Sequence, residues 1–318
     1  MAPLATPHLT LADGTTLPAL GLGTWKAAPG EVGLAVSTAL ELGYRHIDCA
    51  SIYGNEAEIG SALAAALGQG RVRRDELWIT SKLWNDCHAP AQVRPALEQT
   101  LRDLQLDHLD LYLIHWPVAH RHGVLIPSSA ADQIPLQQLP LQDTWGAMEA
   151  LVDAGLVRQI GVSNCSATKL TDLMPHCRMQ PAMNQVERHP WLQQPALLTF
   201  CQQHGIALTA FSPLGSAPAA DTEDTLLNDA VINAIAATHG VSPAQVLLAW
   251  GLACGTAVIP KSVNRQRLAA NLGAVQLQLS AEELERISRL DRGQRLNSGR
   301  VWALPGGSYT LANLWDGA

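Results

Sequence analysis

Residues 31–48 read EVGLAVSTALELGYRHID, and this stretch joins a helical pattern directly to a strand pattern. From 31 to 42 the apolar residues recur three and four positions apart, which is typical of one face of an amphipathic helix. Gly43 follows, and glycine readily takes the left-handed conformation in which many helices end. The run from Tyr44 to Asp48 then predicts a buried strand. A helix that passes into a buried strand indicates an α/β fold.

The same alternation continues along the chain. Strands are predicted at 19–22, 44–48, 77–81, 109–114, 157–162, 182–186, 207–211 and 257–259. Helices are predicted at 31–42, 56–68, 90–104, 142–154, 166–174, 195–204, 228–254 and 264–272. The strand cores are apolar throughout, as expected of parallel strands that are covered on both faces. Eight such units predict a closed (β/α)8 TIM barrel, with a doubly wound open sheet as the alternative.

Several segments lie outside this repeat. An N-terminal β-hairpin is predicted at about 8–17, because Asp13-Gly14 favours a tight turn. We expect two helices beyond the eight of the barrel, one of them at 281–290 after the N-cap residue Ser280. The stretches 117–140 and 213–225 are too long for ordinary loops, and 293–318 lacks helical periodicity. Long segments at a barrel mouth usually shape a binding site, so we expect 293–318 to be a substrate loop of one domain spanning 1–318.

Composition limits the classes of partner. The formal net charge is −7 and no long block of lysine or arginine occurs, which disfavours nucleic acid and anionic membranes. The six cysteines are scattered without a CxxC pair, which is typical of reduced thiols in a cytosolic protein. The sequence has neither a secretory pattern at residue 1 nor an apolar run of ~18 residues. We therefore expect a cytoplasmic protein, and of the possible oligomeric states we favour a monomer.

Four ionisable residues stand at or just after the predicted ends of three successive strands: Asp48, Tyr53, Lys82 and His115. These ends converge on one face of a barrel, so the side chains can meet there. A tyrosine of pKa ~10 is a poor acid at neutral pH unless a neighbouring cation stabilises its phenolate. We expect Lys82 to be that cation, Asp48 to hold it, and His115 to orient a carbonyl oxygen. Such a set can protonate the alkoxide that forms in carbonyl reduction.

Three other functions are open to the same residues. A metal-dependent hydrolase could draw ligands from His46, Asp48, His115, His189 and the pair His120 and His122. Lys82 at the same rim would repel a metal ion, so we expect none in the reaction. A Schiff-base lyase could use Lys82 or Lys261. A non-catalytic NADPH-binding subunit is the third, because a barrel fold alone does not establish activity.

Four segments carry a resemblance to the aldo-keto reductase family. They are GYRHIDCASIYGNE (43–56), TSKLW (80–84), LDLYLIHWP (109–117) and IPKSVNRQRLAAN (259–271), and the resemblance runs in order from about Leu9 to Asp291. It implies that Tyr53 is the general acid of a tetrad with Asp48, Lys82 and His115. It also implies NADPH-dependent reduction of aldehydes and some ketones to alcohols, as in aldehyde and aldose reductases.

The resemblance implies a cofactor site as well. The matching positions are Gly23, Thr24, Trp25, Asp48, Ser163, Asn164, Gln185, Phe211, Ser212, Leu214, Ser216, Ile259, Pro260, Lys261, Ser262, Val263, Asn264, Arg267 and Asn271. Phe211 stands where the family commonly has a tyrosine, and a phenyl face can also stack on a nicotinamide ring. Ala270 replaces an acid often found beside the adenine.

The type of cofactor follows from charge. Lys261, Ser262, Arg265 and Arg267 place four donors at the start of the last barrel helix. The loops after strands seven and eight form the usual phosphate site of a barrel, and guanidinium groups pair well with a phosphate monoester. The 2′-phosphate of NADPH or NADP+ is therefore the expected ligand of this basic site. A Rossmann domain is not supported, because the Gly21-Leu-Gly23 fragment stops short of GxGxxG.

The substrate is expected to be a small carbonyl compound in an apolar cup. Trp25, Trp84 and Trp116 follow three predicted strand ends, and Trp302 lies in the tail. All four match pocket walls of the family, and with His115 they form the predicted substrate site.

Overall fold

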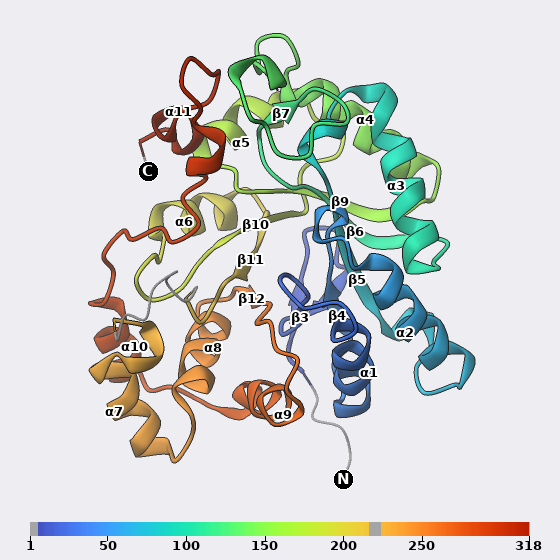
Figure 1. Ribbon diagram of the computed structural model, residues 1–318. Helices are drawn as coiled ribbons and strands as arrows, with labels where there is room; N and C mark the ends of the chain where they lie inside the picture. Colours follow the sequence, from blue (N-terminus) through green and yellow to red (C-terminus); the bar gives the residue numbers. More distant parts are fainter. Residues whose placement is uncertain (1–5, 216–223, 318) are drawn as a thin grey trace.

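A computed structural model describes residues 6–215 and 224–317, and parallel strands form its centre (Figure 1). Their spatial order is β12 (Ala257–Val258), β11 (Ala207–Phe211), β10 (Met183–Glu187), β9 (Val157–Ser163), β6 (Leu109–Ile114), β5 (Trp78–Leu83), β4 (His46–Asp48) and β3 (Leu22–Gly23). The first strand also meets the last, since the amides of Gly21 and Gly23 donate to the carbonyls of Val258 and Pro260 at 2.9 and 3.1 Å. The sheet therefore closes, which confirms the predicted (β/α)8 barrel.

Helices surround the strands and bury one face against them. The eight that follow the strands are α1 (Val32–Leu42), α2 (Glu56–Gly68), α3 (Pro90–Leu104), α4 (Leu141–Asp153), α5 (Ala167–Leu173), α6 (Pro195–Gln203), α8 (Pro243–Ala253) and α9 (Arg265–Gly273). The glycine after the first helix ends it as predicted: Gly43 has φ 111° and donates to two carbonyls of the last turn. Such a φ suits glycine, which lacks a Cβ.

The helix predicted at 228–254 is wrong as a single element. The structure has α7 (Ala230–His239) and α8, which are bent by 94° at the break between them. Gly240 ends the first with φ 64°, and Ser242 caps the second by accepting from the Gln245 amide, with Pro243 at its first turn. The extra helices are thus α7 and α10 (Ala281–Ser288), with a short α11 (Leu311–Trp315) in the tail where no helix was predicted.

The predicted hairpin closes the end of the barrel at which the parallel strands begin. Strands β1 (His8–Thr10) and β2 (Thr16–Pro18) pair antiparallel, and the Asp13 side chain accepts the Thr15 amide at the turn. Leu11 and Leu17 from this hairpin pack with Trp78 and Met183 of the barrel strands in one buried cluster. The hairpin thus covers the apolar residues at this end of the barrel. The opposite end stays open and contains the candidate site.

The segment 117–140 folds over the mouth of the barrel and is tied to the tail. It contains the short antiparallel strands β7 (Ala119–His120) and β8 (Gln133–Ile134). The Tyr309 hydroxyl accepts from the Ala119 amide at 2.8 Å and donates to the Ile134 carbonyl at 2.6 Å. The loop and the tail are therefore joined through the Tyr309 side chain.

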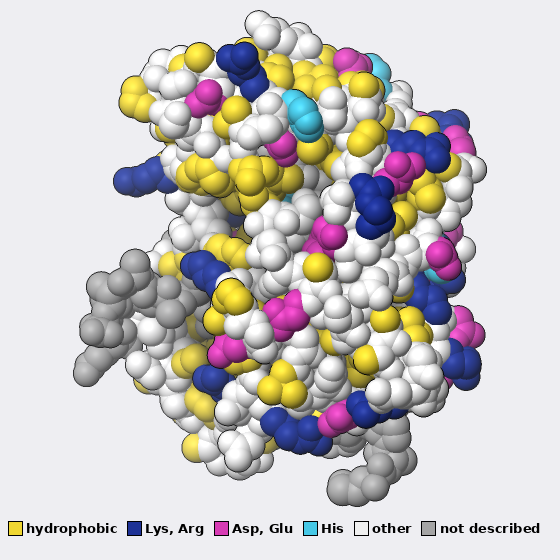
Figure 2. All heavy atoms as spheres, turned by 45° about the vertical axis from the view of Figure 1, so that its right-hand side comes forward, with side chains coloured by type: hydrophobic (Ala, Val, Ile, Leu, Met, Phe, Trp, Pro, Cys, Tyr) yellow, Lys and Arg dark blue, Asp and Glu magenta, His cyan; other side chains and the backbone are white. Residues whose placement is uncertain are grey.

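The outer surface carries both signs of charge. Figure 2 shows Lys and Arg side chains interspersed with Asp and Glu over the face that it presents. Within residues 6–215 and 224–317, no single helix is long and apolar enough to cross a membrane. Only when α7 and α8 are taken together are their length and apolar composition sufficient, and this pair is sharply bent.

Candidate active site

A cavity of about 850 Å³ opens at the C-terminal ends of the barrel strands. Its lining brings together residues from the first strand, the last strand, the loop 117–140 and the tail. Among the predicted site residues, it includes Gly23, Thr24, Trp25, Asp48, Tyr53, Trp84, His115, Trp116, Ser163, Asn164, Gln185, Phe211, Ser212, Leu214, Ile259, Pro260, Lys261 and Trp302. Lys82 lies just below, buried and bonded to Asp48.

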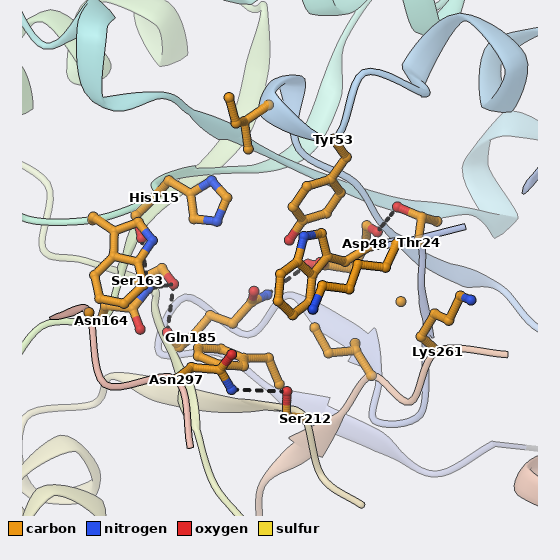
Figure 3. Close-up of a pocket in the computed structure, with 18 of the residues that line it drawn as sticks. Thr24, Asp48, Tyr53, His115, Ser163, Asn164, Gln185, Ser212, Lys261 and Asn297 are labelled. Atoms are coloured by element: carbon orange, nitrogen blue, oxygen red, sulfur yellow. Dashed lines mark hydrogen bonds between the residues drawn. The ribbon is translucent and has the colours of Figure 1, made fainter. Parts of the chain in front are cut away.

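A buried ion pair lies beneath this cavity, of whose lining residues Figure 3 labels Asp48, Tyr53 and Gln185. The Lys82 ammonium, fully buried on β5, donates to the Asp48 carboxylate at 2.5 Å and to the Cys49 carbonyl at 2.8 Å. The Gln185 amide donates to the other Asp48 oxygen at 2.7 Å. Desolvation lowers the pKa of Lys82, but the charges of Asp48 and Tyr53 outweigh it and the net shift is upward. The lysine is therefore held as a fixed cation.

Tyr53 stands above that cation on the short helix η1 (Ser51–Tyr53), with Lys82 Nζ 5.2 Å from its ring centroid. Desolvation raises the pKa of Tyr53 to about 12, although the charge of Lys82 and its hydrogen bond to the phenol pull it down. Burial thus outweighs the acidifying effect expected of Lys82. The consequence is a phenol that is fully protonated at neutral pH and has a cation ready to stabilise its phenolate.

His115 follows β6 and faces Tyr53 edge-on, with ring centroids 5.8 Å apart and planes at 78°. Desolvation, followed by repulsion from Lys82 and His88, holds the pKa of His115 well below its ordinary value. The imidazole is therefore neutral near pH 7 and can donate one hydrogen bond without carrying charge. Its Nδ1 is buried and has no hydrogen-bond partner among the described residues.

Polar groups of β9 and β10 form a second wall. The Ser163 hydroxyl donates to the Gln185 carbonyl at 2.7 Å, and the Asn164 amide donates to the His115 carbonyl at 2.9 Å. Asn164 has φ 59°, a left-handed conformation that asparagine tolerates better than most residues. Its Oδ1 is buried and has no partner within the described part of the chain. This wall therefore offers one free acceptor to a ligand amide.

The residues of the predicted phosphate site lie partly in the cavity lining and partly outside it. Lys261 lines the cavity and Arg267 is exposed on α9, and neither forms an ion pair with a described residue. Arg265 is instead paired with Glu41, with 2.8 Å between Nη1 and Oε2. Five predicted cofactor residues lie outside the lining: Ser262, Val263, Asn264, Arg267 and Asn271. Ser216 falls outside the described residues.

Aromatic rings form the opposite wall. Trp84 contacts His115 at a centroid distance of 4.9 Å and Trp302 at 5.7 Å, and Trp116 lies 5.7 Å from Trp302. The first-strand rim adds Trp25, which is 42% exposed. Further lining residues were not predicted individually, namely Lys26, Ile52, Ile126, Pro213, Gly215, Asn297, Ser298, Gly299, Arg300 and Val301. Most come from the tail and long loops, where only the length of the segment signalled a role.

Known proteins resemble this chain over nearly its whole length. The model of the aldo/keto reductase family matches residues 19–292. An aldo/keto reductase of Synechocystis sp. is 55% identical, over 97% of this chain and 96% of its own. Aldo-keto reductase family 1 member A1 of Homo sapiens is 44% identical, over 92% and 91%. The aldose reductase structure from Schistosoma japonicum has a TM-score of 0.86 at 43% identity, over 92% of this chain and 95% of its own. The chain belongs to the aldo/keto reductase family.

Proposed function

We propose that this oxidoreductase reduces aldehydes and some ketones to alcohols with NADPH, with Tyr53 as the general acid. The family supports carbonyl reduction with a nicotinamide cofactor. The observation that carries the finer assignment is Lys82, a buried cation that Asp48 fixes beside the phenol of Tyr53. The same lysine disfavours a Schiff-base lyase, because an ammonium whose pKa is raised has no lone pair for attack.

The donor set fits a nicotinamide dinucleotide. The buried, unpartnered Oδ1 of Asn164 suits a carboxamide N–H, and the half-buried Phe211 offers a ring face for stacking. Lys261 and Arg267 would hold the 2′-phosphate near the N-terminus of α9, where backbone amides favour an anion. When bound, NADPH supplies the hydride for the carbonyl carbon. The chain's own residues bind the cofactor, orient the carbonyl and deliver the proton.

Proton delivery follows from the pKa shifts. The alkoxide formed from a carbonyl is a far stronger base than a phenolate, so Tyr53 with a pKa of about 12 still transfers its proton downhill. The Lys82 charge then stabilises the phenolate that remains, and Asp48 keeps the lysine in place. Neutral His115 orients the carbonyl oxygen by hydrogen bonding. The aromatic wall excludes water from the reacting atoms.

The test is the Tyr53→Phe variant, which keeps the ring and removes the acidic proton. We expect kcat for aldehyde reduction to fall about 10²–10⁴-fold, the range of general acid catalysis, with NADPH affinity unchanged. Steady-state loss of NADPH absorbance measures turnover, and fluorescence titration measures binding. Tyr112→Phe is the control, because Tyr112 is buried in the layer between barrel and helices, away from the cavity. Full turnover by Tyr53→Phe would reject the assignment.

A second test separates NADPH from NADH. In Lys261→Ala and Arg267→Ala, the loss of a charged hydrogen bond to the 2′-phosphate costs about 1.5–3 kcal/mol, so NADPH should bind about 10–100-fold more weakly. NADH lacks that phosphate and should bind as before. The exposed Arg286 on α10 provides the control Arg286→Ala. Equal losses for both cofactors would refute the role in phosphate binding.

A further inference from the structure

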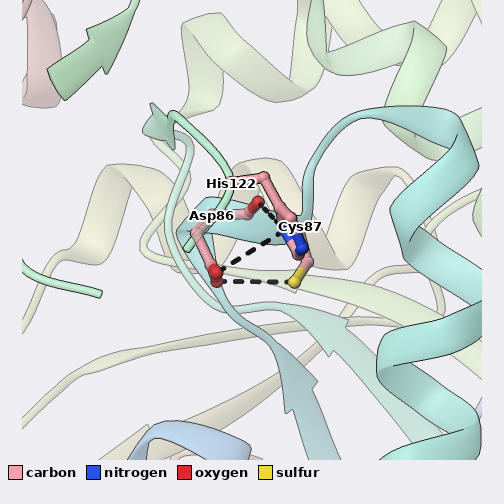
Figure 4. A group of neighbouring side chains, drawn as sticks. All are labelled: Asp86, Cys87 and His122. Atoms are coloured by element: carbon pink, nitrogen blue, oxygen red, sulfur yellow. Dashed lines mark hydrogen bonds and ion pairs between the residues drawn. The ribbon is translucent and has the colours of Figure 1, made fainter. Parts of the chain in front are cut away.

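We propose that Asp86, Cys87 and His122 form a binding site for a divalent transition-metal ion of the zinc class, outside the catalytic tetrad. Asp86 and Cys87 lie on the short helix η3 (Asn85–Cys87), directly after β5. His122 comes from the loop 117–140, and the three side chains point toward one another (Figure 4). One potential ligand atom from each lies within 4.8 Å of the other two.

The spacing of these atoms is close to what a tetrahedral ion requires. Bonds of ~2.0–2.3 Å from zinc to oxygen, nitrogen and sulfur place neighbouring ligand atoms roughly 3.3–3.8 Å apart. Here Cys87 Sγ lies 3.4 Å from Asp86 Oδ1, and His122 Nδ1 lies 3.8 Å from Asp86 Oδ2. These two distances run to different oxygens of the Asp86 carboxylate. One of those oxygens, the thiol and the imidazole nitrogen lie within 4.8 Å of one another, so side-chain rotations must draw them closer around a single ion.

The surroundings favour an ion that enters from solvent and is then held. The Asp86 carboxylate is nearly buried, and the Gly123 amide donates to its Oδ2 at 3.1 Å, which orients it. Cys87 is half-buried, whereas the His122 side chain is 59% exposed. The ion therefore has an open approach on the histidine side, and a water molecule can complete the coordination.

The ligand chemistry selects the class of metal. Thiolate, imidazole and a single carboxylate suit Zn²⁺ and Co²⁺, whereas Mg²⁺ and Ca²⁺ require mostly oxygen ligands. On binding, the Cys87 thiol releases its proton to the buffer and the sulfur forms the metal bond. His122 Nδ1 gives up its 3.2 Å hydrogen bond to the Asp86 carbonyl. The ring takes the tautomer that carries its proton on Nε2, and the Nδ1 lone pair binds the metal. The ion is not reduced or oxidised.

A bound ion would join two walls of the cavity mouth. Trp84 precedes η3 and lines the cavity, and its indole donates to the Leu125 carbonyl at 2.8 Å. Ile126, in the same loop as His122, also lines the cavity. The metal would therefore fasten the loop to the end of β5, and hydrogen exchange over residues 119–134 should slow when it binds.

Metal binding to the full-length, phosphine-reduced protein tests the proposal directly. We expect one equivalent of Zn²⁺ after equilibrium dialysis, and with Co²⁺ the intense visible bands and thiolate charge-transfer absorption of a tetrahedral site. Cys87→Ala should abolish the charge-transfer band, and His122→Ala, whose side chain is exposed and tolerates change, should weaken binding at least tenfold.

The matched controls are Cys177→Ala and His176→Ala, which remove an equally half-buried thiol and an exposed imidazole elsewhere. Both should bind one equivalent as the wild type does. The proposal is overturned if the wild type binds no Zn²⁺ or Co²⁺, if Cys87→Ala retains the cobalt–thiolate band, or if the control pair loses binding equally. Since none of these readouts uses turnover, the result is independent of the proposed reaction.

Discussion

Glu56 is a buried carboxyl group at the start of α2, beside the strand β5 that carries Lys82. It accepts from the Ser81 hydroxyl at 2.5 Å and from the Thr100 hydroxyl at 3.0 Å, and it is 4% exposed. Burial raises its pKa to about 7, against the lowering effect of these hydrogen bonds. Near neutral pH this carboxyl group therefore titrates inside the folded protein.

This titration predicts how stability depends on pH. Between the unfolded pKa of ~4.3 and the folded value of about 7, the folded state binds more protons, so the free energy of unfolding falls as pH rises. The loss amounts to roughly 4 kcal/mol once the pH exceeds 7, at about 1.36 kcal/mol for each pKa unit between the two values. Glu56→Gln should remove this slope. Urea unfolding at pH 5, 6, 7 and 8 measures it, and parallel curves for both proteins would contradict the assignment.

Single residues of the site could be chosen from the sequence, but not their net electrostatics. The placement of Asp48, Lys82 and His115 at strand ends follows from the barrel, which converges those ends on one face. The pKa of Tyr53 does not follow, because desolvation depends on walls contributed by distant segments. The pairing of Arg265 with Glu41 likewise depends on how α1 packs beside α9.

At the scale of elements, α2 and α3 approach so closely that only glycine fits between them. A Cβ on Gly60 would overlap the Asp103 carbonyl oxygen and lie 2.7 Å from Leu104 Cα. Because these are backbone atoms, the helices themselves would have to separate. We expect Gly60→Ala to lower the free energy of unfolding by about 3 kcal/mol.

The same helix supplies the control for that prediction. A Cβ on Gly68 meets nothing within 4 Å, so Gly68→Ala should be neutral or stabilising by up to about 1 kcal/mol. Denaturant unfolding of both variants measures the difference. Similar stability for the two alanine variants would show that the helices can move apart at little cost.

Element boundaries were predictable where local signals agree with tertiary packing. The bounds 56–68 and 90–104 are confirmed, as are the strands 109–114 and 207–211. The single helix at 228–254 failed because its apolar pattern continues across Gly240 and Ser242, although these residues carry ordinary stop and start signals. The tail helix α11 was missed since five residues are too few to show a period.

At the scale of the whole molecule, the mouth is held by contacts between segments far apart in sequence. Tyr309→Phe removes the hydroxyl that joins Ala119 to Ile134 and leaves two buried backbone groups without that partner. We expect a loss of about 1–3 kcal/mol in unfolding free energy and a higher KM for the carbonyl substrate. Cofactor affinity should not change. Calorimetry and steady-state kinetics measure these effects, and an unchanged KM would argue against control of the mouth by this bridge.

The closed barrel was predictable as a whole, whereas its mouth was not. Repetition of helix and strand fixes the number of units, and closure follows from the twist of parallel strands. The loop 117–140 and the tail 293–318 have no repeat, and their fold depends on side-chain bridges such as Gln133 to Trp302 at 2.7 Å. Their role was therefore predictable from length, but their residues were not.

The hydrogen bonds that close the barrel between β3 and β12 have a consequence for folding during synthesis. They join residues from opposite ends of the chain, so a ribosome-bound chain that still lacks its final strand has two bare sheet edges. Unpaired sheet edges can pair with strands of other chains, and strands far apart in the sequence pair slowly. The nascent chain should therefore depend on chaperones until its synthesis is complete.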